Sequence, residues 1–408
     1  MSFCLLPTEL VRQIASYLPP SSLFQLLLAS DLAYRRVHDI LYRDLVLSAN
    51  LAAHAVNARQ LDEIQRHGAV RSQDLAHTRT FNMGTTFSNE LLGDVLPKMG
   101  GLRALTFDMR VQGTSEDALN AIYSALGTLP RLQSLTITNL PEYHRDRERC
   151  IIPFHFIESG HRFDLSRVAP PLSLTHLNIC VSDLGIRKHL PLRTSLKVLV
   201  LQMPRLDKSC VDAIFELRSL KTLRLIEPKR ITPWEIGATT PSFTELEEFG
   251  FGERNFETPS QWQPNMLWCY CERETIPHGF MDAIISTNPG IRRLTLLHLT
   301  DGILARLVHV EELEVVFSID HTEMPTFSQT EILRFLERQR GLRRLILPFT
   351  GLRLSVPLLR ALEGLTECVR ISTPCDPDLM DVCEDQRTLE LARSLWVFGE
   401  LFIIFCFS

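Results

Sequence analysis

A short apolar phrase recurs along most of this 408-residue chain and limits the folds that the chain can adopt. The phrase consists of an apolar residue, two variable residues, a second apolar residue, one variable residue and a third apolar residue. Because its last two apolar positions are two residues apart, they share one face of a β-strand. The well-formed copies end on the apolar pairs Leu105/Phe107, Leu135/Ile137, Leu177/Ile179, Leu199/Leu201, Leu223/Leu225, Phe249/Phe251, Leu294/Leu296, Leu313/Val315 and Leu345/Leu347. A weaker first copy ends on Phe81/Met83, and a poor last copy lies between residues 365 and 371.

The segments between these copies predict helices. Residues 115–126, 210–217 and 330–339 each place apolar side chains three or four positions apart, which is the spacing of one helix face. One strand and one helix cannot enclose a core alone, but stacked units can share one. The pattern therefore predicts an α/β solenoid over residues 75–373. A doubly wound α/β fold offers no reason for the recurring phrase.

This pattern resembles the leucine-rich-repeat family in its longer, ribonuclease-inhibitor-like form, which implies helices outside and a strand-lined concave face. The family usually places Asn or Cys three residues beyond the last apolar position of the phrase. The corresponding residues here are Leu140, Ser182, Pro204, Pro228 and Arg254. Because the usual asparagine ladder is missing, we expect an irregular solenoid with unevenly spaced repeats.

Residues 6–45 predict three short helices before the repeats. Leu6-Pro7 with Glu9 begins the first helix, because proline suits a first-turn position and a carboxylate there favours the helix dipole. An apolar stripe follows, formed by Leu10, Ile14, Tyr17 and Leu18. Pro19-Pro20 ends this helix, Ser21 or Ser22 can cap the second, and residues 34–45 form the third.

So small a helical domain cannot bury all of its leucines. Its surplus apolar face needs a neighbour, either the rest of this chain or a second protein. The residues alone leave both possibilities open.

The same segment resembles an F-box, the module by which substrate receptors of SCF (Skp–cullin–F-box) ubiquitin ligases dock on the Skp adaptor. The resemblance implies that eight residues bind the adaptor: Leu6, Pro7, Glu9, Leu10, Ile14, Leu18, Leu23 and Leu26. Ser30 and the closing Leu41-Tyr42-Arg43 also match. The segment departs from the family at Ala29-Ser30-Asp31-Leu32, where Cys or Val with Arg and Trp is usual, and at Tyr42, which replaces the closing Trp.

An F-box followed by leucine-rich repeats resembles the fungal substrate receptors of SCF ligases. The resemblance implies a non-catalytic subunit that contacts the Skp adaptor and, through it, the cullin scaffold, while the solenoid holds an unidentified target protein. We predict an F-box over residues 1–48, a helical linker over 49–74, the solenoid over 75–373 and an acidic and apolar tail over 374–408. The alternative is a protein-interaction scaffold whose N-terminal helices only cap the repeats.

Target contacts would come from outward positions of the strands, which alternate with the buried positions. The candidates are Thr106, Asp108, Thr136, Thr138, Asn178, Gln202, Arg224, Arg293, Thr295, Glu312, Glu314 and Arg344. Each of them could equally be an ordinary solvated strand residue. The later repeats alternate in charge, through Arg292-Arg293, Glu311-Glu312 and Arg343-Arg344. That alternation could recognise a charged partner, or it could reflect pairing between neighbouring strands.

Composition and motifs argue against several other functions. The net charge of −5 gives no reason to expect nucleic acid or an anionic membrane surface as a partner. The ten cysteines include no CxxC pair, which favours free thiols in the cytoplasm or nucleus. No catalytic motif is present, so we expect no enzyme activity and no cofactor. Cys269, Cys271 and His278 lack the spacing of a structural zinc site, so we expect no bound metal.

Two further segments carry open alternatives. The insertion with Trp262, Trp268 and Tyr270 could anchor a partner or could cover the solenoid core. Residues 395–407 are strongly apolar but shorter than the roughly 20 residues of a membrane-spanning helix. They could cap the last repeat, anchor a tail or represent a misassigned coding end.

Overall fold

The computed structural model of the chain describes most of the repeats and the N-terminal helices. The described residues are 6–19, 22–23, 25–26, 31–47, 75–83, 89–108, 115–138, 165–169, 173–180, 195–202, 206, 208–226, 240–253, 279–296, 299, 301–315, 328–339, 341–347, 356–362, 368–371 and 405–406. The chain divides into two compact units, unit 1 (Met1–Cys180) and unit 2 (Val181–Ser408).

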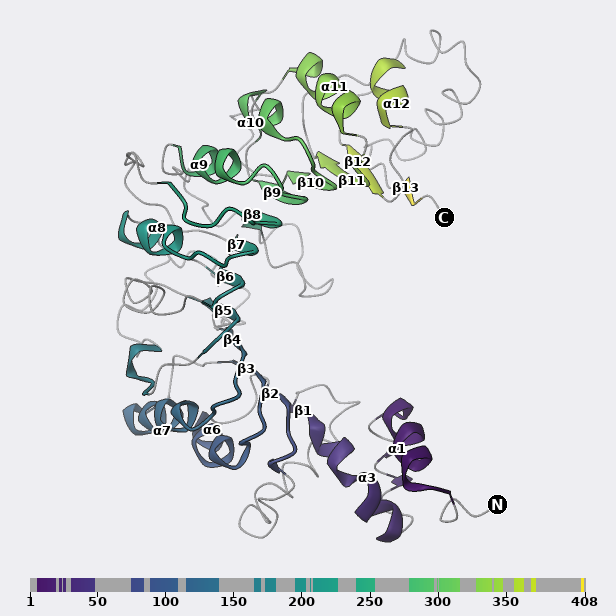
Figure 1. Cartoon of the computed structure of the whole chain (residues 1–408), viewed down its shortest axis with the longest axis vertical. Coiled ribbons are helices and arrows are strands. Elements are labelled where there is room, and N and C mark those ends of the chain that lie inside the picture. The colour runs from purple at the N-terminus through teal and green to yellow at the C-terminus, as the bar shows by residue number, and fades with distance from the viewer. Residues whose placement is uncertain are drawn as a thin grey trace, which may run out of the picture. The chain divides into compact units, whose positions relative to one another are not determined.

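Unit 1 combines the N-terminal helices with the first strands of the solenoid (Figure 1). Its elements are α1 (Thr8–Tyr17), α3 (Asp31–Arg43), β1 (Asp44–Leu47), β2 (Thr80–Met83), α6 (Asn89–Val95), the 3₁₀ helix η2 (Leu96–Lys98), β3 (Ala104–Asp108), α7 (Glu116–Gly127), β4 (Ser134–Thr138), the 3₁₀ helix η3 (Leu165–Arg167) and β5 (His176–Cys180). Residues 22, 23, 25 and 26, between α1 and α3, are also helical. Strands β1 to β5 pair in chain order, and each pair is parallel.

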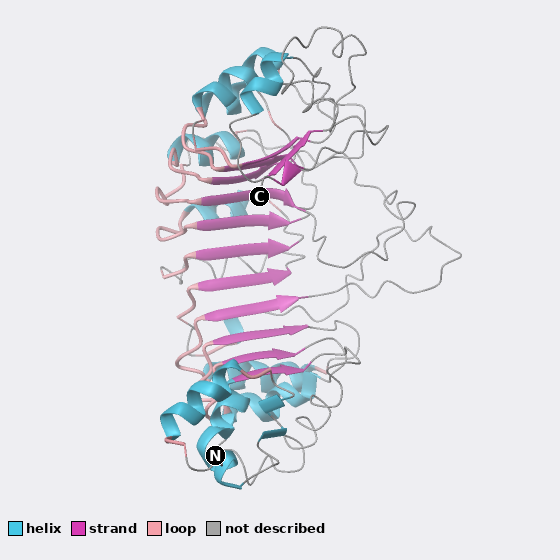
Figure 2. Cartoon of the chain, turned by 90° about the vertical axis from the view of Figure 1, so that its right-hand side faces the viewer, coloured by secondary structure: helices cyan, strands magenta, loops and turns pink. Residues whose placement is uncertain are grey.

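Unit 2 repeats the same arrangement of strand and helix. Its elements are β6 (Val198–Gln202), α8 (Lys208–Phe215), β7 (Thr222–Ile226), β8 (Glu248–Glu253), α9 (Phe280–Thr287), β9 (Arg293–Leu296), α10 (Asp301–Arg306), β10 (Glu312–Val315), α11 (Gln329–Arg338), β11 (Arg344–Leu347), α12 (Val356–Leu362), β12 (Cys368–Ile371) and β13 (Phe405–Cys406). Strands β6 to β12 pair in parallel, and β13 pairs antiparallel with β12. Figure 2 shows the strands of each unit running side by side.

The recurring phrase forms the strands as the sequence predicts. In unit 1 the middle apolar residues of successive phrases, Phe81, Leu105, Leu135 and Leu177, are direct partners in the sheet. All four are buried. In unit 2 the same position aligns Leu199, Leu223, Phe249, Leu294, Leu313 and Leu345, which are buried as well. Parallel strands joined by helices, in chain order, are the architecture of a leucine-rich-repeat solenoid, and the prediction is confirmed.

Local signals in the sequence explain several helix ends. The Ser115 hydroxyl caps α7 by accepting a hydrogen bond from the Ala118 N–H at 3.1 Å, and the Ser328 hydroxyl caps α11 through the Glu331 N–H at 3.2 Å. Helix α1 ends before Leu18, whose backbone is extended because Pro19 follows. Among the described residues, no helix is both long enough and apolar enough to cross a membrane.

Buried amides connect neighbouring repeats of unit 2. Asn288 follows α9 and is 1% exposed. Its Oδ1 accepts a hydrogen bond from the Leu246 N–H at 3.1 Å, and its Nδ2 donates to the Ile284 carbonyl at 2.9 Å. Gln339, after α11, donates from Nε2 to the Leu307 carbonyl at 2.7 Å. These amides satisfy backbone groups of the turns from a different position than the family's usual asparagine.

The third helix, predicted over residues 34–45, is instead α3 (Asp31–Arg43), because the residues that follow it pair with a neighbouring strand. Residues 44–47, assigned from sequence to the segment 1–48, form the first strand of the sheet and pair with β2. Tyr42, Leu45 and Leu47 have the spacing of the repeated phrase, and the sheet therefore starts directly after α3. The compact units divide after Cys180, inside the predicted solenoid. In the tail, β13 adds an antiparallel strand to β12, which agrees with a capping role for these two residues.

Candidate functional site

The N-terminal helices have a small core of their own. Val11 and Ala15 of α1, Leu23 of the second helical segment and Val37 of α3 form a buried cluster. Five partly buried side chains pack against this cluster: Leu6, Leu18, Leu26, Tyr34 and Ile40. The inward face of α1 is therefore formed by Val11 and Ala15, followed by Leu18 just after the helix.

The neighbouring face of α1 leaves its large apolar side chains accessible. Leu10 is 46% exposed, Ile14 is 41% exposed and Tyr17 is 81% exposed. Their spacing of four and three residues places them in one stripe along the helix. Leu32, in the first turn of α3, is 39% exposed. Among the described residues, Val308 of unit 2 is the fifth large apolar side chain that is similarly accessible, at 53%.

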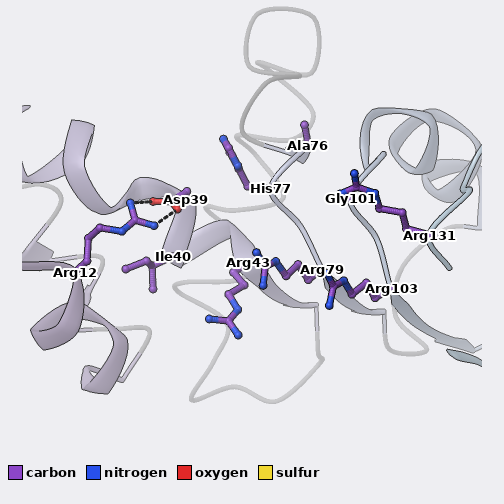
Figure 3. A pocket seen from close by; sticks show the side chains of 10 residues that line it. All are labelled: Arg12, Asp39, Ile40, Arg43, Ala76, His77, Arg79, Gly101, Arg103 and Arg131. Atoms are coloured by element: carbon purple, nitrogen blue, oxygen red, sulfur yellow. Dashed lines mark hydrogen bonds and ion pairs between the residues drawn. The ribbon is translucent and has the colours of Figure 1, made fainter. Parts of the chain in front are cut away.

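Polar contacts hold α1 against α3. The Arg12 guanidinium forms two hydrogen bonds with the Asp39 carboxylate, from Nη1 to Oδ1 at 3.0 Å and from Nη2 to Oδ2 at 2.5 Å (Figure 3). This hydrogen bonding raises the pKa of Arg12 above its ordinary value. Arg36 of α3 donates from Nη1 to the Leu6 carbonyl at 2.9 Å. These contacts fix α1 with its inner face on the core cluster and leave Leu10, Ile14 and Tyr17 accessible.

The eight residues predicted to bind an adaptor fall into three environments. Leu10 and Ile14 are exposed apolar residues, and Pro7 and Glu9 are exposed at the beginning of α1. Leu6, Leu18 and Leu26 are partly buried against the helical core. Leu23 is 4% exposed and belongs to that core. The sequence placed Leu10, Ile14, Tyr17 and Leu18 in one stripe, but Leu18 packs on the inner side.

Two accessible residues were missing from the predicted adaptor contacts. Tyr17 continues the stripe of Leu10 and Ile14, and its spacing alone could have indicated it. Leu32 occupies a position where the segment departs from the F-box pattern, so the resemblance offered no signal there.

Some target candidates of unit 1 lie next to one another. Thr106, Thr136 and Asn178 are direct partners on β3, β4 and β5 and form a continuous polar row. Asp108 is paired in register with Thr138 beside that row. In unit 2, Gln202 ends β6 opposite Ile226. Among the described residues, no other target candidate is a direct strand partner of Gln202.

The charged target candidates of unit 2 form ion pairs across the strands. These pairs include Arg224 with Glu248 at 3.6 Å, Arg293 with Glu312 at 3.2 Å and Arg344 with Glu314 at 3.5 Å, and the neighbouring Arg343 pairs with Glu311 at 3.0 Å. Of the two interpretations of the alternating charges, the structure therefore favours cross-strand pairing. The same pattern continues to Lys221 and Glu247, which are 2.7 Å apart. The hydrogen bond from Lys221 lowers the pKa of Glu247 and raises that of Lys221.

Several other sequence hypotheses concern residues outside the described structure. Cys269, Cys271 and His278 lie there, as do the aromatic residues of the same insertion. Within the described part of the chain, no group of three or more His, Cys, Asp or Glu side chains is placed to hold a metal ion.

Comparisons with known proteins found similar structures but no matching sequence family. No protein-family model matches the chain, and no curated protein sequence matches it either. Among solved structures, a chain of the yeast Rad7 and Elc1 complex is similar, with a TM-score of 0.47, 13% identity and coverage of 76% of this chain and 75% of that one. An internalin (inlF) from Listeria monocytogenes has a TM-score of 0.40, 16% identity and coverage of 76% and 78%.

A chain of the mouse RP105/MD-1 complex is also similar, with a TM-score of 0.36 and 14% identity. The match covers 79% of this chain and 54% of the mouse chain. At these scores the similarity carries no argument about function. The assignment of the fold rests on the strand register and on the repeated phrase.

Proposed function

We propose that this chain is the substrate-recognition subunit of an SCF-type ubiquitin ligase of the fungal kind. The N-terminal helices dock on the Skp-type adaptor, which connects the chain to the cullin scaffold, and the solenoid holds a target protein. The chain performs no chemical step in this proposal. It raises the effective concentration of the target near a ubiquitin-charged enzyme.

One observation carries the proposal: an apolar stripe remains accessible on α1. Leu10, Ile14 and Tyr17 lie on a helix whose other face already has a packed core. Leu10 and Ile14 occupy positions where the F-box resemblance implies contact with the adaptor. Accessible apolar side chains grouped in this way are typical of protein-binding surfaces.

The test measures capture of a purified Skp-type adaptor by the full chain. The variant replaces Leu10 and Ile14 together, as Leu10→Glu with Ile14→Glu. Burying each of these side chains in an interface is worth about 1.5–3 kcal/mol, so the double variant should weaken binding by well over a hundredfold. Circular dichroism checks that the helices remain folded.

Val308→Glu provides the matched control. It places a carboxylate at an exposed apolar position of unit 2, and adaptor binding should remain at the wild-type level. Leu6→Ala with Pro7→Ala should also abolish capture, but Leu6 packs against the helical core, so this variant disturbs folding as well. Unchanged capture by the Leu10/Ile14 variant would contradict the proposal and leave a scaffold without ligase association.

A further inference from the structure

The last two strands of unit 2 bring two cysteines to directly opposite positions. Strands β12 and β13 are antiparallel neighbours (Figure 1), and their register pairs Cys368 with Cys406. Val369 and Phe405 form the adjoining pair. The two cysteines are far apart in sequence, and they meet because residues 405–406 return to the strand of the last repeat.

This register meets the backbone requirement of a disulfide bond. The Cα atoms of directly opposite residues in an antiparallel pair lie about 4.5 or 5.5 Å apart, depending on whether the residues exchange backbone hydrogen bonds. A disulfide joins residues whose Cα atoms are roughly 4.4–6.8 Å apart. Both distances fall inside this range, and direct partners share one face of the sheet. The backbone therefore allows Cys368 and Cys406 to be joined without a shift of either strand.

Sequence proximity alone would favour other partners for Cys406. Cys375 and Cys383 are closer to it along the chain than Cys368 is, and both lie outside the described residues. In an unfolded chain the nearer thiols pair more readily, because the entropic cost of closing a loop rises with its length. Selective pairing of Cys406 with Cys368, the most distant of the three, would therefore be a property of the folded register.

The pairing of β13 with β12 is short enough to benefit from a covalent bond. Strand β13 has two residues, whereas strands in globular proteins usually have about 3–10. Strand β12 lies between β11 and β13 in the sheet. Without β13, one side of β12 has no strand partner, and its backbone groups are open to pairing with another chain. A bond between Cys368 and Cys406 would keep that side covered.

We propose that Cys368 and Cys406 form a reversible disulfide that fastens β13 to β12 under oxidising conditions. The oxidant is a low-molecular-weight disulfide, such as oxidised glutathione. The thiolate of one cysteine attacks this disulfide, which gives a mixed disulfide and releases one glutathione. The thiolate of the other cysteine then attacks the protein sulfur of the mixed disulfide and releases the second glutathione. The two cysteine protons end on the two glutathione thiols, so one oxidised glutathione is reduced for each bond formed.

The bond is a switch in the reducing compartment that the cysteine pattern predicts. Disulfides of cytosolic proteins are usually transient or redox-sensing, and reduced glutathione reverses both steps of the exchange. The inference goes beyond the proposed function and does not depend on it, because β12 and β13 belong to unit 2 and contribute nothing to the exposed stripe of α1. Cys368→Ser should accordingly capture the adaptor as the wild type does.

The first test identifies the bond in the full chain by mass spectrometry. The chain is incubated with oxidised glutathione, the remaining thiols are blocked with N-ethylmaleimide, and trypsin digests the chain without reduction. Trypsin leaves the thiols on three peptides: residues 361–370 with Cys368, residues 371–387 with Cys375 and Cys383, and residues 394–408 with Cys406. Links from 394–408 to 361–370 should exceed links to 371–387 by at least about tenfold, because the register holds the two cysteines together.

Unfolding and matched variants separate the register from chance pairing. In urea the preference should reverse, because chain statistics favour Cys383 over Cys368 by about twofold at these loop lengths. Cys375→Ser with Cys383→Ser should leave the link between Cys368 and Cys406 intact, and Cys368→Ser should remove it. A folded chain that links Cys406 chiefly to Cys375 or Cys383, or that leaves Cys406 unlinked, would overturn the proposal.

Hydrogen exchange tests whether the bond fastens the strand. The amides of β12 should exchange at least about tenfold more slowly in the oxidised chain than in the reduced chain, because the closed loop disfavours release of β13. The amides of β9 and β10 should exchange equally in both states. Cys368→Ser should show no difference between oxidising and reducing buffer. Equal exchange of β12 in oxidised and reduced wild type would overturn the fastening role.

Discussion

At the scale of single residues, the buried amide of Asn288 is expected to contribute more to stability than its small size suggests. Asn288→Ala removes the acceptor of the buried Leu246 N–H and the donor to the Ile284 carbonyl. Because unsatisfied buried groups lose their solvation without compensation, the free energy of unfolding should fall by about 1–3 kcal/mol. Urea unfolding measures this change. Gln13→Ala, at an exposed position on α1, should shift it by no more than about 0.5 kcal/mol.

Glu247 is expected to make stability depend on acidity. Its pKa is lowered in the folded chain, chiefly by the hydrogen bond from Lys221, so its contribution is present above the unfolded pKa of about 4.3 and is lost as pH falls through the folded value. Glu247→Gln should therefore lower the urea midpoint slightly at pH 7, and the difference from wild type should diminish as the pH falls through the folded pKa of Glu247. High salt should shrink it, because the pair is exposed.

Glu216→Gln is the control for this acid dependence. Glu216 is an exposed carboxylate on the same unit, and the described residues include no ion-pair partner for it. A difference between wild type and Glu247→Gln that stays constant from pH 7 to pH 3 would contradict the electrostatic explanation.

The sequence predicted some residue environments better than others. The phrase identified the buried strand residues because apolar residues two positions apart lie on the same face of a strand. On α1, both Leu10 with Ile14 and Val11 with Ala15 repeat at four residues, so spacing alone could not assign the inner face. The buried pair is Val11 and Ala15, whose smaller side chains allow α1 to approach α3 closely.

At the scale of elements, the two faces of α1 are expected to have different roles, the inner face in stability and the accessible face in binding the adaptor. Val11→Ala removes two carbon atoms from the core cluster, and the unfolding free energy of the helical segment should fall by about 1–2 kcal/mol. Ile14→Ala, on the accessible face, should change it by less than about 0.5 kcal/mol. Chemical denaturation followed by circular dichroism measures both variants. A larger loss for Ile14→Ala than for Val11→Ala would show that the stripe is covered within the chain.

The elements themselves were largely predictable because each repeat uses local signals. Apolar spacing located α7 and α11, and Pro19-Pro20 located the end of α1, within one or two residues. Strand β1 was missed because its phrase coincides with the closing residues of the F-box-like segment. Its assignment to the sheet required pairing with residues 80–83, more than thirty positions away. Spacing within one short segment does not contain that information.

At the scale of the whole molecule, each compact unit is expected to respond to damage in its own core. Phe280 of unit 2 packs against Phe215, Phe249 and Phe251, with ring centroids 5.7, 6.3 and 6.0 Å away. Phe280→Ala should cost about 3–5 kcal/mol. In a solenoid each repeat depends mainly on its neighbours, so the loss should concentrate in the strands from β7 to β9. Hydrogen exchange should show faster exchange of their amides and unchanged protection of β2 to β4, whereas equal loss in both units would mean that the chain unfolds as one cooperative body.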